Sequence, residues 1–339
     1  MKKFQKQIQK TKKQLELEQA VNNIDTAVMV AGIDTNAVKS PTYYEGTYIA
    51  FSHDATRTRT RNGDYIYRLN PANTGIDTSN IFGYCEAMNK IMEDTDLENP
   101  IKSRIDFKFD LDSDYCVHYK LMSLFIELIA TCYDIDNVYD SNHKRSAKKL
   151  TVRAQPKHGE FEIEYYNKAM QEPDGFIPAR LELRSKKLYK CECSETEKEI
   201  HAWNVWQERM HKAIDREVFD RLVNSKNDEL IQRYSEERQT GETATFEEFV
   251  HDHRNDIYTK RQFIDLAIRC DVDRPECALR NYRKTHKLRF FSERQVKHLV
   301  KILEKSMQMF FNPRIELVTD AASDTAARLE IRTSTKIVA

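Results

Sequence analysis

The 339-residue sequence has no excess charge of either sign, no long apolar run and no regular cysteine spacing. Its 54 Lys and Arg balance its 54 Asp and Glu, so the chain as a whole has no electrostatic attraction for a polyanion. Local basic patches must supply any such attraction. No segment approaches the roughly 20 apolar residues that span a bilayer. No apolar stretch follows the basic N-terminus, as it would in a signal peptide. We therefore expect no membrane association.

Cysteine usage argues against a disulfide framework. The seven cysteines are an odd number at irregular spacings, which favours a reducing, cytoplasmic location. Cys191 and Cys193 form a C-x-C pair in the same region as His201. Zinc sites prefer paired C-x2-C or H-x3-H spacings, so the sequence alone argues against structural zinc here.

The length and composition allow a sizeable core. Hydrophobic residues make up 40% and charged residues 32% of the chain, which is ordinary for a soluble helical protein or a nucleic-acid binder. At this length we expect two domains.

Four segments alternate apolar and polar residues with a period of two, which predicts strands. They are Leu150–Gln155, Phe161–Lys168, Arg180–Lys186 and Ser103–Asp112. A one-residue slip would bury every charge, so the pattern fixes which residues share a face. The predicted core residues are Leu150, Val152, Phe161, Ile163, Tyr165, Leu181 and Leu183, with Ile105, Phe107, Phe109 and Leu111. The predicted polar face holds Thr151, Arg153, Glu162, Glu164, Tyr166, Lys168, Arg180, Glu182 and Arg184, with Asp106, Lys108, Asp110 and Asp112.

If these strands are neighbours, carboxylates and cations surround Tyr166. Attack by a tyrosine on a phosphodiester spreads negative charge over the phosphate oxygens, which a divalent cation or an Arg/Lys clamp stabilises. A solvated strand face has the same pattern, and both interpretations stay open from the residues alone. The hypothetical site has Tyr166 as nucleophile, Lys168 and Arg180 as phosphate contacts, and Asp106, Asp110, Glu164 and Glu182 as ligands of Mg²⁺ or Mn²⁺.

Helical periodicity predicts helices over Thr78–Asp94 and Tyr119–Tyr133, the second of which should pack on the sheet. Tyr43–Phe51 and Asp64–Arg68 predict a hairpin. We therefore expect an α+β fold in which an antiparallel sheet has helices packed on one face. A mainly helical C-terminal domain should follow it.

The C-terminal part changes character near residues 190–200, where we place a domain boundary. Helices over Thr259–Cys270, Pro275–Thr285 and Ser292–Phe311 resemble a helix-turn-helix module, and a plain bundle with a solvated basic face is the alternative. The expected divisions are 1–22, a basic helix or arm; 23–190, the α+β domain; 195–312, the helical domain; and 313–339, a flexible tail. The predicted nucleic-acid contacts are Arg57, Arg59 and Arg61 at the hairpin tip, Arg184 and Lys186 on the sheet, and Arg280, Arg283, Lys284 and Lys287 in the helical part.

Three short motifs carry a resemblance to a known family. They are R-I-D-F-K-F-D at Arg104–Asp110, E-Y-Y-N-K at Glu164–Lys168 and A-R-L-E-L-R at Ala179–Arg184. In this order they resemble the rolling-circle replication initiators and relaxases of Gram-positive plasmids and conjugative elements, and the related filamentous-phage initiators. The resemblance covers roughly residues 23–190.

The resemblance implies nicking of one DNA strand at an origin through a 5′-phosphotyrosyl intermediate, with a divalent metal. It also implies double-stranded origin DNA and the single-stranded nick site as partners, a homodimer and a host helicase. The chain departs from the family where A-Q-P-K-H-G precedes the Y-N-K strand, and no His-x-His metal motif is present. A non-enzymatic origin or operator binder and an oligomeric scaffold are the alternatives.

Overall fold

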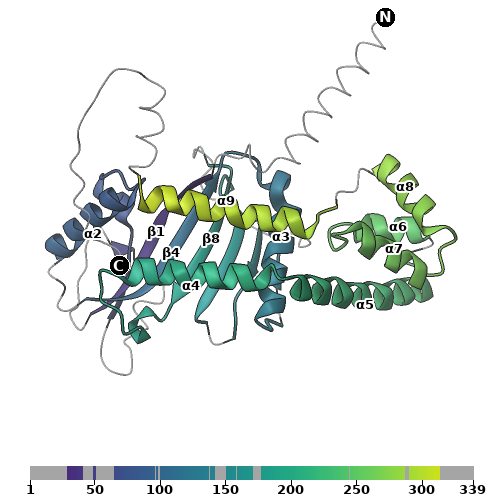
Figure 1. Cartoon of the computed structure of the whole chain (residues 1–339), viewed down its shortest axis with the longest axis horizontal. Coiled ribbons are helices and arrows are strands. Elements are labelled where there is room, and N and C mark those ends of the chain that lie inside the picture. Colours follow the sequence, from purple (N-terminus) through teal and green to yellow (C-terminus); the bar gives the residue numbers. More distant parts are fainter. Residues whose placement is uncertain are drawn as a thin grey trace, which may run out of the picture.

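The protein has an α+β fold, with one antiparallel sheet, helices on one of its faces and a helical C-terminal region (Figure 1). This confirms the fold class that the sequence predicts. The computed structural model describes residues 29–40, 49–50, 65–95, 97, 100–136, 138–141, 150–157, 159–170, 177–243, 245–286 and 290–313. The predicted N-terminal arm, Arg57, Arg59, Arg61, Lys287 and the tail beyond Pro313 lie outside these residues.

Within the described ranges the sheet contains eight strands in the order β2-β3-β1-β4-β8-β7-β6-β5, and neighbouring strands run antiparallel. Because β4 adjoins β8, a strand from the first third of the chain lies beside the meander of β6, β7 and β8. The strands are β1 (Met29–Ser40), β2 (Ile49–Ala50), β3 (Tyr65–Leu69), β4 (Ile101–Leu111), β5 (Val138–Asp140), β6 (Thr151–Ala154), β7 (Phe161–Asn167) and β8 (Ala179–Lys186). The pairing of β2 with β3 is the described part of the predicted hairpin.

The alternation of the strands produces one apolar face, as predicted. Phe107 and Phe109 of β4, Ile163 of β7 and Leu181 and Leu183 of β8 are all fully buried in one core. The physical reason is the pleat, which sends every second side chain to the same side.

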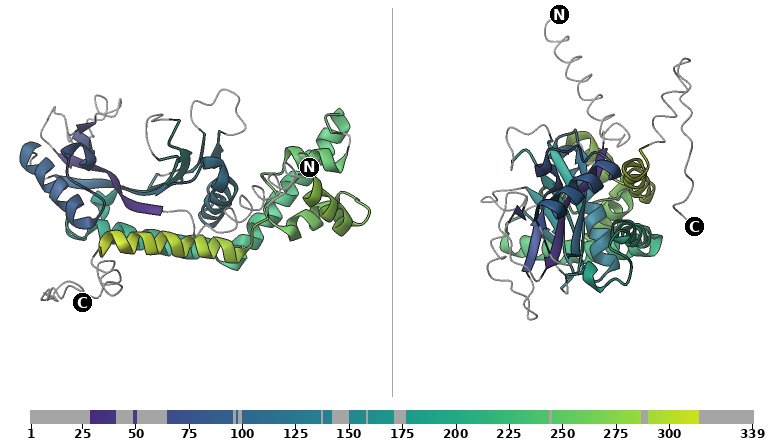
Figure 2. Two further views of the ribbon diagram at one scale, coloured as in Figure 1. Left: turned by 90° about the horizontal axis from the view of Figure 1, so that it is seen from above. Right: turned by 90° about the vertical axis from the view of Figure 1, so that its left-hand side faces the viewer.

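Four helices cover this apolar face: α2 (Ile81–Thr95), α3 (Tyr115–Cys132), α4 (Lys198–Ala213) and α9 (Glu293–Phe311). The views of Figures 1 and 2 show α4 and α9 lying across the strands on the same side of the sheet. The ring of Trp203 packs against Phe107 with centroids 5.5 Å apart, and Trp206 packs against Phe161 at 5.4 Å. Burying one such aromatic side chain contributes about 1.5–3 kcal/mol, so α4 is an integral part of the sheet's core.

The long helix α5 (Arg216–Thr240) carries the chain away from the sheet (Figure 1). It begins at Asp215, whose side chain caps the Glu217 amide, and ends at Gly241, where φ of 78° suits a residue without Cβ. At its far end α6 (Phe246–Asp252), α7 (Lys260–Arg269) and α8 (Pro275–His286) enclose a second, smaller core. Two short 3-10 helices, Pro71–Thr74 and Leu188–Lys190, complete the described elements. Every helix in the described part of the chain is too short or too polar to cross a bilayer.

The described residues form two hydrophobic cores. Leu299 and Leu303 of α9 belong to the core under the sheet, as do the two tryptophans of α4. The second core includes residues of the later part of α5 and of α6 to α8, together with Ile257 between α6 and α7, and Phe290 packs against it. The predicted helices α7, α8 and α9 are present, but α9 returns to pack on β1. Helix α8 packs against α7, and residues of α5 and α6 belong to the same core.

Candidate functional site: the polar face of the sheet

The polar residues of β4, β8 and β7 lie side by side in three rows across the sheet. The strand register places Arg184 between Asp106 and Glu162, Glu182 between Lys108 and Glu164, and Arg180 between Asp110 and Tyr166. The sequence predicts the face of each residue, and the strand pairing brings the residues together. The neighbouring strand β6 adds Thr151, whose hydroxyl donates to Glu164 at 3.0 Å.

This face is not a solvated one. Asp106 is 0%, Glu182 3%, Arg180 4%, Glu164 6% and Asp110 8% exposed. Burying a charge is costly unless it is paired and hydrogen-bonded, so the pairs described below are a physical requirement of this arrangement.

Arg184 is the centre of the cluster. Its guanidinium donates to Glu162 and Glu182 through short contacts and to Glu164 Oε2 at 2.6 Å. Its Nε also lies 3.8 Å from Asp106 Oδ2. Although burial by itself would lower the pKa of Arg184, the surrounding carboxylates raise it above its usual range. The Arg184 side chain therefore stays positively charged and contacts several carboxylates at once.

Two further arginines pair with the aspartates of β4. Arg180 forms a two-pronged contact with Asp110, with Nε to Oδ1 at 2.5 Å and Nη2 to Oδ2 at 3.1 Å. Arg104 makes the same type of contact with Asp106, at 2.7 and 2.5 Å. Burial raises the pKa of Asp106, while the hydrogen bonds and charge of Arg104 and the charge of Arg184 oppose that rise.

Tyr166 lies on this face with its hydroxyl donating to Glu182 Oε1 at 2.7 Å. Arg180 Nη1 is 3.8 Å from the same oxygen. Burial alone would raise the pKa of Glu182, but the charge of Arg184 and the hydrogen bonds from Tyr166 and Arg184 lower it to about 2. The phenol is therefore oriented by an ionised carboxylate. Its neighbour Tyr165 points into the core, as the alternation predicts.

The four predicted cation ligands offer hard carboxylate oxygens, the donor type that Mg²⁺ and Mn²⁺ prefer. Each of them contacts at least one arginine: Asp106, Asp110, Glu164 and Glu182. These acids do not form a cluster of close donor atoms. Among the described residues, such a cluster is formed by Cys191, Cys193 and His201, whose donor atoms all lie within 4.8 Å of one another. The acids therefore fit a hard cation in chemical type, but Arg184 would have to give up its contacts for them to converge on one.

The remaining predicted sheet residues lie at the margin of the cluster. Lys168 follows the end of β7 and is half-buried. Lys186, at the end of β8, donates to Glu162 at 2.5 Å. Arg184 and Lys186, the predicted nucleic-acid contacts of the sheet, are thus both engaged with acidic side chains.

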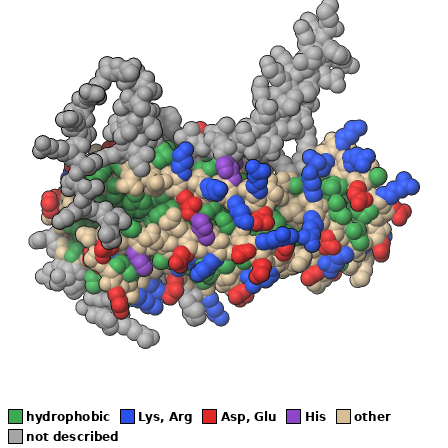
Figure 3. Space-filling model, viewed as in Figure 1, with side chains coloured by type: hydrophobic (Ala, Val, Ile, Leu, Met, Phe, Trp, Pro, Cys, Tyr) green, Lys and Arg blue, Asp and Glu red, His purple; other side chains and the backbone are tan. Residues whose placement is uncertain are grey.

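The predicted basic residues of the helical part lie far from this cluster. Arg280, Arg283 and Lys284 are exposed on α8. Figure 3 shows Lys and Arg side chains gathered at the end of the molecule that α6 to α8 form. The structure therefore separates the polar face of the sheet from a basic helix at the tip.

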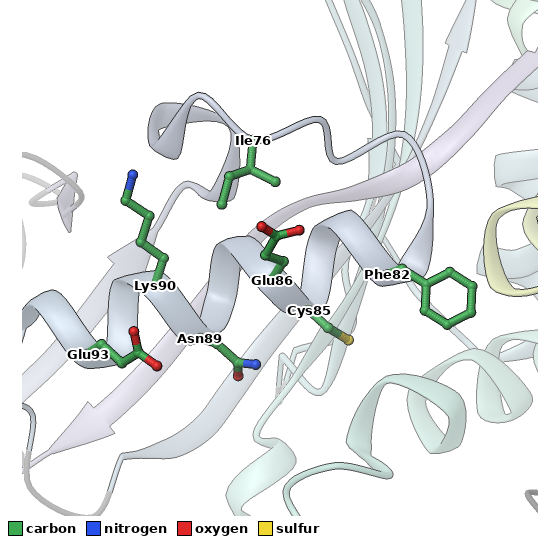
Figure 4. Close-up of a pocket in the computed structure, with 7 residues that line it drawn as sticks. All are labelled: Ile76, Phe82, Cys85, Glu86, Asn89, Lys90 and Glu93. Carbon is green, nitrogen blue, oxygen red and sulfur yellow. The ribbon is translucent and has the colours of Figure 1, made fainter.

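A hollow along α2 is a separate feature (Figure 4). Its lining mixes apolar and charged residues: Ile76, Phe82, Cys85, Glu86, Asn89, Lys90 and Glu93. Burial and the nearby Glu199 carboxylate raise the pKa of the Cys85 thiol, which disfavours a reactive thiolate there. None of the polar-face residues lines this hollow.

Sequence reasoning missed two features of the molecule. The first is Arg104, which belongs to the cluster and contacts Asp106. It stands two residues before Asp106 in the same strand, so the two-residue alternation places it on the polar face. The second is the convergence of Cys191, Cys193 and His201. The sequence shows a C-x-C pair and a histidine eight residues later, and this spacing matches no common metal-binding motif.

No protein-family model and no curated protein matches the chain. Among solved structures, the rolling circle replication initiator protein from Geobacillus stearothermophilus is similar with a TM-score of 0.26 and 8% identity. The similarity covers 52% of this chain and 80% of that one. A similarity this weak carries no functional inference, so function must be inferred from the residues themselves.

Proposed function

We propose that this protein nicks one strand of DNA at a replication or transfer origin, with Tyr166 as the nucleophile. One observation carries the proposal: the Tyr166 hydroxyl lies 2.7 Å from Glu182, within a buried face that also holds Arg180 and Arg184. The motif resemblance points to the same tyrosine.

The proposed reaction is a transesterification. The Tyr166 oxygen forms a bond to phosphorus, the bond from phosphorus to the 3′ oxygen breaks, and the phenol proton ends on the released 3′-hydroxyl. Glu182 orients the phenol by accepting its hydrogen bond. Because its own pKa is about 2, the Glu182 carboxylate does not keep a proton taken from the phenol at neutral pH. Arg180 is the proposed contact for the charge that develops on the phosphate, together with Lys168.

Asp106, Asp110, Glu164 and Glu182 are the residues proposed to hold a divalent Mg²⁺ or Mn²⁺. When bound, the cation would supply positive charge to the non-bridging phosphate oxygens. Because Arg184 neutralises two of these acids, its side chain would have to change partners as the cation binds. Arg184 thus links cation binding to the packing of the cluster.

DNA recognition is assigned in this proposal to the basic residues of α8, far from the nicking site. Arg280, Arg283 and Lys284 are exposed there and able to reach phosphates. A second copy of the chain and a host helicase are proposed partners on the motif resemblance alone.

The test is to incubate the full-length protein with a randomised single-stranded DNA library and Mg²⁺ or Mn²⁺. A covalent adduct should survive denaturing electrophoresis and map to Tyr166 by peptide mass spectrometry. Tyr166→Phe should yield no adduct, whereas Tyr165→Phe, a change on the opposite face of the same strand, should retain it. An undiminished adduct in Tyr166→Phe would reject this nucleophile.

A second candidate function is sequence-specific DNA binding without cleavage. The ion pairs of the polar face favour this candidate, because buried arginines and acids that pair with one another can serve the stability of the fold alone. The sheet would then have no catalytic role. This candidate predicts salt-sensitive binding by the wild-type protein and Tyr166→Phe alike, with no adduct under any metal condition.

A further inference from the structure

Two cysteines and a histidine converge just after β8, at a place that the nicking chemistry does not use. Sγ of Cys191, Sγ of Cys193 and a ring nitrogen of His201 all lie within 4.8 Å of one another. In a tetrahedral zinc site with Zn–S bonds of about 2.3 Å, ligand atoms are about 3.8 Å apart, as follows from the geometry. Side-chain rotation alone could therefore bring the three donors to one ion.

The local backbone explains this convergence. Lys187 adopts a left-handed conformation with φ of 61°, which turns the chain out of β8 into the short 3-10 helix Leu188–Lys190. Cys191 then caps that helix, its amide donating to the Leu188 carbonyl at 3.0 Å. The Cys193 amide donates to Cys191 Sγ at 3.4 Å, which folds the C-x-C segment tightly around the first sulfur.

His201 approaches from a different element. It lies in the first turns of α4, where its amide donates to the Glu197 carbonyl at 2.9 Å. Because α4 is fixed to the sheet by Trp203 and Trp206, the histidine is carried on a rigid element, while its own side chain is exposed. An exposed imidazole and two partly exposed thiols leave room for an ion to enter.

The donor set selects the type of metal. Thiolate and imidazole ligands suit Zn²⁺ and other borderline or soft ions, whereas Mg²⁺ and Mn²⁺ prefer oxygen. Two thiolates would also neutralise the charge of a divalent ion. Lys186, Lys187, Lys190 and Arg209 line the same hollow as Cys191 and His201.

We propose that Cys191, Cys193 and His201 bind one Zn²⁺ ion, with the fourth coordination position filled from solvent. The ion ties the segment that follows β8 to the start of α4, and so holds the end of the strand that carries Arg180, Glu182 and Arg184. This site does not depend on the proposed nicking activity, and either can fail without the other.

The test is titration of the reduced, metal-free full-length protein with Co²⁺, in the presence of a phosphine reductant. One equivalent of Co²⁺ should produce a thiolate-to-cobalt charge-transfer band, and Zn²⁺ should displace it. Cys191→Ser, Cys193→Ser and His201→Gln should each lose the one-equivalent binding. Cys116→Ser, which removes a thiol exposed on α3, is the matched control and should bind as the wild type does.

A second measurement guards against misfolding of the cysteine variants. Zn²⁺ should raise the melting temperature of the wild-type protein and of Cys116→Ser, but not of His201→Gln. Since the His201 side chain is exposed, its variant should keep the fold, as circular dichroism would show.

Three outcomes would overturn the zinc site. They are the absence of a charge-transfer band in the wild-type protein, loss of the band in Cys116→Ser, and unchanged Co²⁺ binding by His201→Gln. Glu164→Gln and Glu182→Gln should leave the band intact, which distinguishes this site from a cation at the carboxylates.

Discussion

Tyr165 and Tyr166 are adjacent in the chain and lie on opposite faces of the sheet. The Tyr165 hydroxyl donates to the backbone carbonyl of Tyr115 in the core at 2.9 Å, and its ring stacks on that of Tyr115 with centroids 4.8 Å apart. The Tyr166 hydroxyl instead donates to Glu182 on the polar face. This pair therefore offers two chemically identical substitutions with different expected consequences.

Tyr165→Phe should lower the free energy of unfolding by about 1 kcal/mol, the usual contribution of one hydrogen bond, and leave DNA nicking intact. Tyr166→Phe should abolish nicking. Urea denaturation measures the first effect and adduct formation the second. Loss of nicking in Tyr165→Phe with an unchanged fold would contradict the assignment of Tyr166 as the nucleophile.

Arg184→Met should destabilise the protein by about 3–5 kcal/mol, because it removes the guanidinium that contacts Glu162, Glu164 and Glu182 together and leaves these buried carboxylates with less positive charge around them. Arg153→Ala is the matched control on the same face. Its guanidinium is 3.9 Å from Glu162 and its side chain is 45% exposed, so we expect a loss below about 1 kcal/mol. Chemical denaturation compares the two, and equal losses would contradict the central position of Arg184.

The lowered pKa of Glu182 predicts how stability depends on pH. A carboxyl whose pKa is lowered from 4.5 to about 2 on folding stabilises the protein above pH 4.5, and that contribution is lost as the pH falls towards 2. It is on the order of 3 kcal/mol, since each pKa unit corresponds to about 1.4 kcal/mol. The stability difference between wild type and Glu182→Gln should therefore shrink over this range, as urea denaturation at several pH values would show.

Glu127→Gln supplies a control of opposite sign. Burial raises the pKa of Glu127, although Lys226 opposes the rise, so ionisation of this carboxyl costs stability in the folded protein. The wild type should gain stability relative to Glu127→Gln as the pH falls through the pKa of the folded state. Parallel pH profiles for the two variants would contradict both assignments.

The two hydrophobic cores should respond separately to cavities. Leu303→Ala in α9 should lower the stability of the sheet by about 2–5 kcal/mol, and Leu266→Ala in α7 should act mainly on the helices α6 to α8. Hydrogen exchange measured along the chain locates each effect. Met309→Ala, at a side chain 37% exposed on α9, should change stability by less than about 0.5 kcal/mol.

The exposed cations of α8 should dominate DNA affinity. Replacing Arg280, Arg283 and Lys284 by Ala should weaken binding and reduce the slope of log K against log salt by about 1 for each phosphate that the variant no longer neutralises. Lys301→Ala combined with Lys305→Ala removes two exposed charges from α9 and should change the slope little. Fluorescence anisotropy at several salt concentrations measures both variants.

Much of this structure follows from local patterns in the sequence. The two-residue period placed Tyr166 and the acids opposite Tyr165 and the core residues, because a pleated backbone leaves no other choice once one face is buried. The helices also follow from local signals. Thr259 and Ser292, for example, form capping boxes at the starts of α7 and α9.

Only the tertiary structure decided which of these elements meet. It placed β4 beside β8, buried the polar face, gathered three glutamates around Arg184, returned α9 to the sheet and brought His201 to Cys191 and Cys193. Alternation and periodicity report the orientation of a side chain relative to its own element. The partners of that side chain depend on contacts between segments far apart in the chain, which local spacing does not encode.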